Sequence, residues 1–147
     1  MRCALPLLTA LGLVGCAAPE VPTPTLQLLA APTSVVIGGR VLSAAAQPIL
    51  VDSDLTVRVQ VGTERPPLPA LTVTGVYVVT DGGVWKRAVT SSQRRGCASG
   101  ACQQATTSGR AAGLRVGQRV QVVTRLQDAT GQSMWLRDAD VAIRATP

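Results

Sequence analysis

Apolar and polar residues alternate in steps of two along much of this chain. In residues 55–61, Leu and Val positions alternate with Thr, Arg and Gln, and residues 119–126 repeat the pattern with Arg and Gln opposite Val, Thr and Leu. Successive side chains of a strand point to opposite faces, so a period of two predicts strands with one buried face. No stretch shows a sustained helical period. The pattern therefore predicts an all-β protein.

Turn residues divide the rest of the chain into further short strands. The Asp- and Gly-containing segments 81–83 and 128–131 indicate turns, and residues 64–69, with three prolines, indicate a loop. Residues 91–113 are polar and contain several glycines, which predicts a long loop with at most a short strand near residues 103–107. Further strands are predicted at residues 34–42, 71–80 with a bulge at Gly75, 84–89, 132–137 and 141–145.

About seven short strands, each with one apolar face and separated by turns, predict an antiparallel sandwich. In strand spacing and size, residues 33–147 resemble an immunoglobulin-like or fibronectin-III-like domain. The sequence departs from the antibody type, because no cysteine pair is spaced to join two sheets and no tyrosine precedes a second cysteine as in a tyrosine corner. The resemblance therefore implies an immunoglobulin-like β-sandwich, and a small β-barrel stays open as the alternative.

The first sixteen residues are arranged like a secretory signal. A basic start precedes apolar-rich residues 4–14, and the segment ends in Leu13-Val14-Gly15-Cys16. This motif matches the lipobox, so the segment resembles a bacterial lipoprotein signal. The resemblance implies that residues 1–15 are a signal peptide and that the Cys16 thiol carries diacylglycerol. An uncleaved anchor or an ordinary secretory signal is the alternative, although eleven residues at ~1.5 Å each cover only about half of a ~30 Å hydrocarbon core.

Residues 16–32 are predicted to be the lipid anchor and a proline-rich linker. Four prolines among small residues favour an extended spacer, which at ~3.1 Å per residue could hold the domain up to ~50 Å from the lipid. Leu26, Leu28 and Leu29 are predicted to dock on the domain as a first edge strand. By resemblance to known sorting patterns, Ala17 after the lipidated cysteine does not signal retention in an inner membrane. The favoured location is therefore the outer membrane of the bacterial cell envelope, where two membranes are present.

The cysteines outside the signal indicate one local disulfide. Cys3 leaves with the signal and Cys16 is lipidated, so Cys97 and Cys102 remain in an exported domain, where disulfides persist. A redox-active pair would normally have two intervening residues rather than four. Zinc would need two further Cys or His ligands, which the processed chain lacks. The sequence therefore predicts a structural Cys97–Cys102 disulfide, with a redox pair or free thiols as alternatives.

The composition argues against an enzyme and against a bound cofactor or metal. The chain has no His, one Lys and no Gly-x-Ser-x-Gly motif, so the common nucleophile and base arrangements are missing. Two aspartates that are two residues apart on a strand point to the same face. Each such pair could present two carboxylates to a calcium ion at one end of the sandwich, which is the remaining metal hypothesis. The flanking residues Arg58 and Arg137 are instead expected to neutralise these acids. The two acid pairs are Asp52 with Asp54 and Asp138 with Asp140.

The formal net charge is +6, and the basic residues are unevenly placed. No acid occurs between residues 82 and 127, a property of segments that attract polyanions. The candidate polyanion-binding residues of this basic segment, 86–125, are Lys86, Arg87, Arg94, Arg95, Arg110, Arg115 and Arg119. Arg94 and Arg95 are predicted to lie at a loop tip, free to reach a partner. The alternative is that outward-facing Arg side chains keep a Val-rich sheet soluble and block edge pairing.

Aromatic residues make up only 2% of the chain, namely Tyr77, Trp85 and Trp135. So few aromatics give little for bases to stack on, and no nucleic acid partner is expected. The two tryptophans lie in predicted strands and are expected to pack or cover a sheet edge rather than form a sugar platform. The sequence thus predicts a non-catalytic envelope lipoprotein, a membrane-tethered structural or protein-interaction module. The alternative is a binding module for an acidic envelope polymer or glycan that uses the basic segment.

Overall fold

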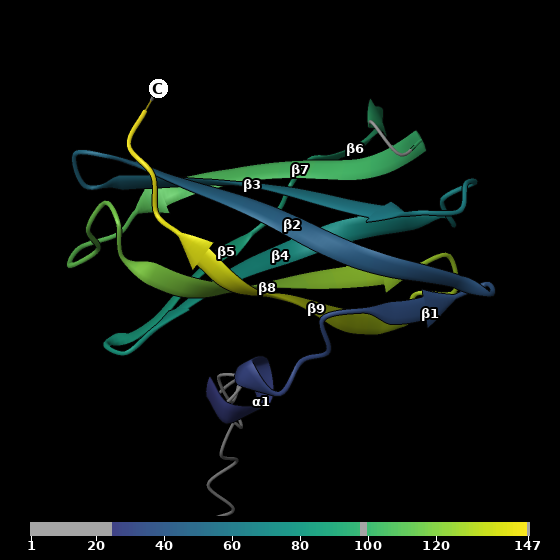
Figure 1. Cartoon of the computed structure of the whole chain (residues 1–147), viewed down its shortest axis with the longest axis horizontal. Coiled ribbons are helices and arrows are strands. Elements are labelled where there is room, and N and C mark those ends of the chain that lie inside the picture. Colours follow the sequence, from purple (N-terminus) through teal and green to yellow (C-terminus); the bar gives the residue numbers. More distant parts are fainter. Residues whose placement is uncertain (1–24, 98–99, 147) are drawn as a thin grey trace, which may run out of the picture.

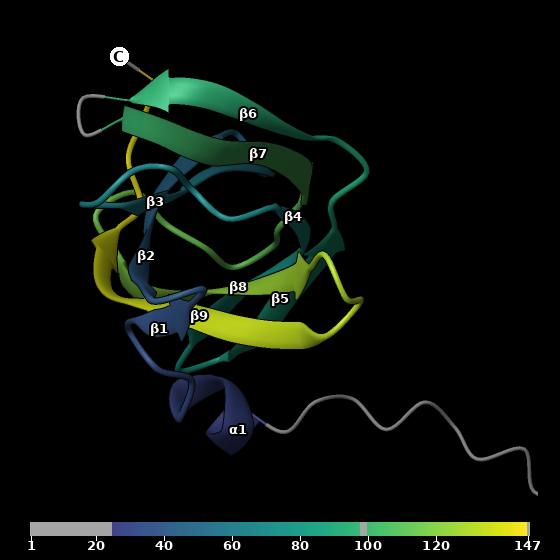
Figure 2. The ribbon, with the colours of Figure 1, turned by 90° about the vertical axis from the view of Figure 1, so that its right-hand side faces the viewer.

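The computed structural model describes residues 25–97 and 100–146, which form nine strands and one short helix, α1 (Thr25–Leu29). The strands make two antiparallel sheets that lie one above the other in Figures 1 and 2. They are β1 (Val35–Ile37), β2 (Arg40–Val51), β3 (Asp54–Thr63), β4 (Leu71–Thr80), β5 (Gly83–Ala88), β6 (Ser92–Cys97), β7 (Gly100–Arg110), β8 (Arg119–Asp128) and β9 (Ser133–Ala142). The predicted all-β sandwich is confirmed, and the strands of this described part do not close into a barrel.

Each sheet combines hairpins with strands that are distant in the sequence. Sheet A has the order β1-β2-β3-β7-β6, and sheet B has the order β5-β4-β8-β9. All strand pairs within the two sheets are antiparallel. The register of β4 against β8 shifts between Val73 and Gly75, which confirms the predicted bulge.

The core between the sheets is aliphatic and follows the period of two. The inward positions of β3 are Leu55, Val57, Val59 and Val61, and each is fully buried. Full burial of a Val or Leu side chain contributes roughly 1.5–3 kcal/mol relative to an exposed one. Strand β8 presents an equivalent inward row to the same core, with Thr124 as its polar member. The alternation predicted for both strands is confirmed.

The C-terminal end of the described chain joins the two sheets along one side. Beyond β9, the chain forms an isolated parallel bridge between Arg144 and Ile49 of β2. The Leu50 N–H donates to the Arg144 carbonyl at 2.9 Å, and the Arg144 N–H donates to the Pro48 carbonyl at 3.0 Å. Figure 1 shows this segment rising from β9 across the end of β2. Sheets A and B are therefore tied by backbone hydrogen bonds as well as by the core.

The segment 91–113 was predicted to be largely loop, but residues 92–97 and 100–110 are the paired antiparallel strands β6 and β7. The prediction was wrong because the inward positions of β7 are small or polar, so no apolar alternation is visible. Ala105 is buried, and so is Gln103, whose amide donates to the Ser92 hydroxyl at 2.7 Å. Buried polar groups in proteins are normally hydrogen-bonded, and here the Gln103–Ser92 hydrogen bond joins β7 to β6 at a position where an apolar contact would be expected. The confirmed Cys97–Cys102 disulfide closes the end of the hairpin, with 5.7 Å between the Cα atoms.

The segment before β1 packs on sheet B, although as a helix rather than as the predicted edge strand. Leu28 of α1 is buried against Val79 and Val123, on the outer face of the sheet. Arg137 fixes the chain after α1, since its Nε donates to the Ala31 carbonyl and its backbone N–H to the Pro32 carbonyl, both at 2.9 Å. The proposed signal peptide, residues 1–15, and Cys16 lie outside the described residues. Within residues 25–97 and 100–146, no helix has the length and apolar character needed to span a bilayer.

Candidate functional site

The outer faces of the two sheets differ in what covers them. Helix α1 lies against the outer face of sheet B, and Figure 2 shows it below that sheet, on the side of the sandwich away from β6 and β7. The outer side chains of sheet A, by contrast, are mostly exposed. In the described part of the chain, the outer face of sheet A is therefore open to a partner, whereas α1 covers part of sheet B.

Neutral polar and small side chains dominate this outer face of sheet A. Gln60 on β3 is flanked by Ala45 on β2 and Gln104 on β7, and Gln104 in turn by Gln93 on β6. The next row along β3 contains Arg58. All three aromatic residues of the chain lie in strands of sheet B. The face therefore presents amides, hydroxyls and guanidinium groups, and it offers no aromatic ring on which a partner could stack.

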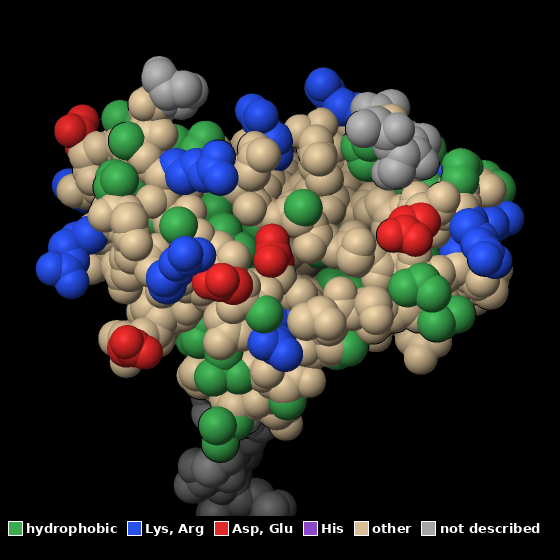
Figure 3. All heavy atoms as spheres, in the orientation of Figure 1, with side chains coloured by type: hydrophobic (Ala, Val, Ile, Leu, Met, Phe, Trp, Pro, Cys, Tyr) green, Lys and Arg blue, Asp and Glu red, His purple; other side chains and the backbone are tan. Residues whose placement is uncertain are grey.

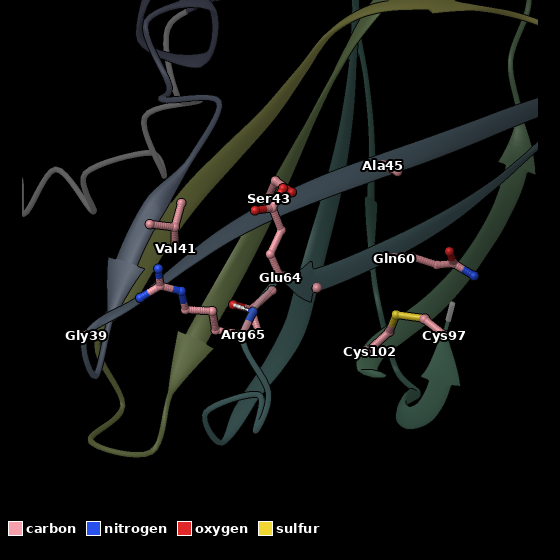
Figure 4. Close-up of a pocket in the computed structure, with 11 residues that line it drawn as sticks. Gly39, Val41, Ser43, Ala45, Gln60, Glu64, Arg65, Cys97 and Cys102 are labelled. Atoms are coloured by element: carbon pink, nitrogen blue, oxygen red, sulfur yellow. Dashed lines mark hydrogen bonds between the residues drawn. A yellow bond between two sulfur atoms is a disulfide. The ribbon is translucent and has the colours of Figure 1, made fainter. Parts of the chain in front are cut away.

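One hollow in this face lies beside the disulfide and has a volume of about 760 Å³. Figure 4 shows Glu64 and Arg65 on one side of it, and Gln60 with the Cys97–Cys102 disulfide on the other. The rim near residue 65 is fixed by hydrogen bonds, because the Arg65 N–H donates to the Thr63 hydroxyl at 3.3 Å and the Arg40 guanidinium donates to the Arg65 carbonyl at 2.9 Å. The hollow is thus an open, mixed-charge surface depression.

A second hollow of about 380 Å³ lies farther along the same face. Arg58 and Arg95 line it together with Gln93, Gln104 and Thr106, and its lining includes no acidic residue among the described ones. The Arg95 Nη2 donates to the Gln93 amide oxygen at 3.3 Å, which orients that guanidinium. In the described part of the chain, the Arg58 guanidinium makes no hydrogen bond or ion pair. This hollow therefore carries two positive charges that no carboxylate of the described residues neutralises.

The predicted basic segment does not form one patch. Lys86 and Arg87 lie on β5 of sheet B, and Arg95 lies on β6 of sheet A. Arg119 on β8 forms an exposed ion pair with Asp140 at 3.0 Å. On the face shown in Figure 3, basic side chains are scattered and acidic ones lie among them. The segment is continuous in sequence but not in space.

Arg94 and Arg95 were predicted at a loop tip, and this placement is wrong. Both belong to strand β6, and neighbouring residues of a strand point to opposite faces. The Arg94 guanidinium donates to the Leu68 carbonyl at 2.8 Å and to the Pro69 carbonyl at 2.9 Å. It therefore holds the 68–69 loop against the edge of sheet A, while Arg95 lines the hollow. Arg110 ends β7 and Arg115 lies in the loop before β8.

The acid pairs are separated and have partners other than those predicted. Asp138 accepts a hydrogen bond from the Ala46 N–H at 3.0 Å, and Asp140 pairs with Arg119 rather than with Arg137. No ion pair joins Arg58 to an acid within the residues described. The structure brings no three acidic or Cys side chains together as metal ligands in residues 25–97 and 100–146. The neutralisation expected from Arg58 and Arg137 is therefore incorrect.

The first pair, Asp52 and Asp54, lies at the β2–β3 turn, far from the second. Asp52 has a positive φ of 54°, a conformation that Asp tolerates better than most residues. Asp54 is the cross-strand partner of Arg110.

The pKa of Asp128, in the turn between β8 and β9, is lowered by hydrogen bonds within that turn. The Thr130 hydroxyl donates to the Asp128 carboxylate at 2.7 Å and is the largest cause, and the backbone N–H groups of Gln132 and Thr130 also lower this pKa.

The two tryptophans pack against the protein, as predicted, and do not form a shared platform. Trp85 contacts the core between the sheets, and its Nε1 donates to the Arg110 carbonyl at 3.0 Å. Trp135 lies in the cluster under α1, with its ring centroid 5.2 Å from that of Tyr77. The two indole rings therefore belong to opposite faces of sheet B.

No family model and no curated protein with which the chain was compared matches it. The evidence for the function of the candidate site is therefore its geometry, because these comparisons give no relative. Sequence reasoning missed Arg58, Gln60, Gln93 and Gln104 as members of one surface. The sequence did contain a signal for two of them, because Arg58 and Gln60 are polar residues at alternate positions of segment 55–61 and must therefore point to the same solvent-facing side of the strand.

Proposed function

We propose that this protein is a bacterial envelope lipoprotein whose sandwich is a non-catalytic interaction module held at a membrane surface. The lipobox Leu13-Val14-Gly15-Cys16 supports lipid attachment at Cys16. Two or more acyl chains suffice for stable anchoring, and the resemblance implies three. The docking of α1 on sheet B, which leaves the outer face of sheet A open, is the observation that carries the proposal.

The position of α1 gives the module an orientation. Because α1 is packed on sheet B, the spacer between Cys16 and Thr25 is only the eight residues 17–24. At ~3.1 Å per residue, eight extended residues reach about 25 Å, roughly half the reach of the linker predicted from sequence. Sheet B therefore faces the lipid, and the outer face of sheet A is presented away from it.

We further infer that the sandwich is of the immunoglobulin-like class. The strand order supports this: β2-β3-β7-β6 pair as strands A, B, E and D do in constant-type domains, and β4-β8-β9 pair as strands C, F and G do. Strand β5 extends the second sheet beside β4, and β1 adds an edge strand to the first. Domains of this architecture occur widely on cell surfaces, which fits an interaction module.

A face-specific cross-linking experiment tests the proposal. A photoreactive residue placed at Thr106, on the outer face of sheet A, should capture an envelope component in intact cells. The same residue at the exposed Ala139, beside α1, is the matched control and should not give that product. Equal capture from both positions, or capture from Ala139 alone, would contradict the orientation.

The alternative function is polyanion binding through the whole basic segment. One observation favours it: the segment 86–125 has no acidic residue. Because exposed charges are screened beyond a Debye length of ~10 Å at 0.1 M salt, such binding should collapse between low and moderate salt. A complex with a packed protein interface should persist over the same range, so the yield of cross-linking at Thr106, measured at a series of salt concentrations before irradiation, distinguishes the two functions.

A further inference from the structure

We propose that the second hollow on sheet A, between Arg58 and Arg95, binds the carboxylate groups of an acidic polysaccharide. This inference deepens the proposed function and rests on it for the presence of such a polymer beside the domain. It differs from binding through the basic segment, because Arg58 lies outside that segment and most of the segment lies elsewhere.

The register places the two arginines on opposite sides of the row of glutamines that crosses β3, β7 and β6. Arg58 on β3 is opposite Thr106, and Arg95 on β6 is opposite Cys102. Gln104 lies on β7 between these two positions. With strands ~4.8 Å apart and a rise of ~3.4 Å per residue, the Cα atoms of the two arginines are separated by about 17 Å. Two cations that reach one hollow from both sides of the amide row suit a polymer with repeating charges better than a single small ion.

The charges of this hollow are available to a ligand. A guanidinium group stays protonated at all physiological pH values and offers a planar fork that matches a carboxylate. Unlike Arg94 and Arg119, whose guanidinium groups are already bound, Arg58 has no partner within the described residues. Among the described residues, Arg95 is held only by the neutral Gln93 amide. Each guanidinium can neutralise one negative charge, which is the charge of one carboxylate.

The surface between the arginines favours a sugar polymer over other polyanions or a protein. Gln93, Gln104 and Gln60 form a continuous row of amides, which both donate to and accept from hydroxyl groups. The face has no aromatic residue on which nucleic acid bases could stack. It also lacks the buried aromatic anchors that dominate protein interfaces. A chain that alternates hydroxyls and carboxylates matches these groups.

The test measures binding of the full mature protein, purified in detergent, to polygalacturonate, with a neutral glycan and polyphosphate as comparison polymers. The double variant Arg58→Gln with Arg95→Gln should weaken polygalacturonate binding by about tenfold or more, since charge-assisted forks are lost at both ends. The matched control, Lys86→Gln with Arg115→Gln, removes the same charge from the basic segment and should change binding less than about twofold. Both variants should keep the melting temperature of the parent, because all four side chains are exposed.

A second variant separates fork geometry from charge. Arg58→Lys with Arg95→Lys keeps both charges but removes the planar forks, so it should still lose several-fold in affinity. Full retention of affinity in this variant would overturn the inference. So would equal losses in the two glutamine variants, equal binding of the neutral glycan, tighter binding of polyphosphate, or no binding of polygalacturonate by the parent.

The binding assay is independent of the proposed lipid anchor. Absence of polygalacturonate binding would overturn this inference alone and leave the tethered module in place. A mature protein that does not begin at Cys16 would overturn the lipoprotein proposal and leave the binding result unaffected.

Discussion

Replacing Leu28 with alanine should release α1 from sheet B while the sandwich stays folded. Leu28 is only 1% exposed and packs with Val79 and Val123, so the substitution removes buried methyl groups and leaves a gap under the helix. The expected cost is about 2–3 kcal/mol, at the low end for Leu→Ala because the site is a single packed layer rather than the central core. A free helix of five residues has no stability of its own in water. Weaker docking therefore also melts α1.

Hydrogen exchange measures this release directly. The Ala31 N–H donates to the Leu28 carbonyl at 3.1 Å, so its exchange reports on docking. A loss of ~2–3 kcal/mol corresponds to roughly 30- to 150-fold faster exchange at this amide. Trp135 lies in the same cluster, so its fluorescence should report the added solvent exposure. The amides of β3 in the central core should exchange as in the parent.

Leu26→Ala is the matched control, because Leu26 belongs to the same helix and is 80% exposed. It should change the exchange of Ala31 by less than about threefold, as expected for a surface substitution worth under ~0.5 kcal/mol. The reasoning would be refuted if the two variants behaved alike. It would also be refuted if Leu28→Ala lowered the stability of the whole sandwich without accelerating exchange around α1.

Two further predictions concern the disulfide and the β8–β9 turn. Reduction of Cys97–Cys102 should lower the free energy of unfolding by no more than ~2 kcal/mol, because the closed loop is short, so circular dichroism should still show a folded β protein; complete unfolding on reduction would contradict this. The pKa of Asp128 is lowered by the Thr130 hydroxyl, so Thr130→Val should raise that pKa toward its ordinary value in an NMR titration. The pKa of Asp128 is lower in the folded state than in the unfolded state. The stabilisation that this carboxylate contributes is therefore fully present above the unfolded-state pKa and is lost as pH falls through the folded-state pKa. An unchanged Asp128 titration in Thr130→Val would contradict the assigned cause.

The sequence predicted those parts of the fold in which one strand face is apolar. Residues 55–61 and 119–126 carry the period of two because their inward side chains fill the central core. The β6–β7 hairpin was missed because its inward positions use Ala and a Gln–Ser hydrogen bond, which hydropathy cannot distinguish from a loop. Helix α1 was missed because five residues are too few to show a helical period.

The candidate site was harder to predict than the fold, because it depends on which strands become neighbours. Arg58 and Arg95 are 37 positions apart in sequence, and the pairing of β7 with both β3 and β6 brings them to one hollow. Charge counting instead highlighted the basic segment, whose members the topology distributes over both sheets. Composition thus indicated the kind of charge available to a partner but not its location.

The central claim, a lipid-tethered envelope module, is tested most directly by intact mass spectrometry of the mature protein isolated from membranes. The account predicts a chain that begins at Cys16 and carries the additional mass of two or three acyl chains, and a Cys16→Ser variant that accumulates as the unprocessed precursor. A mature chain that begins at any other residue, or an unmodified Cys16, would contradict it.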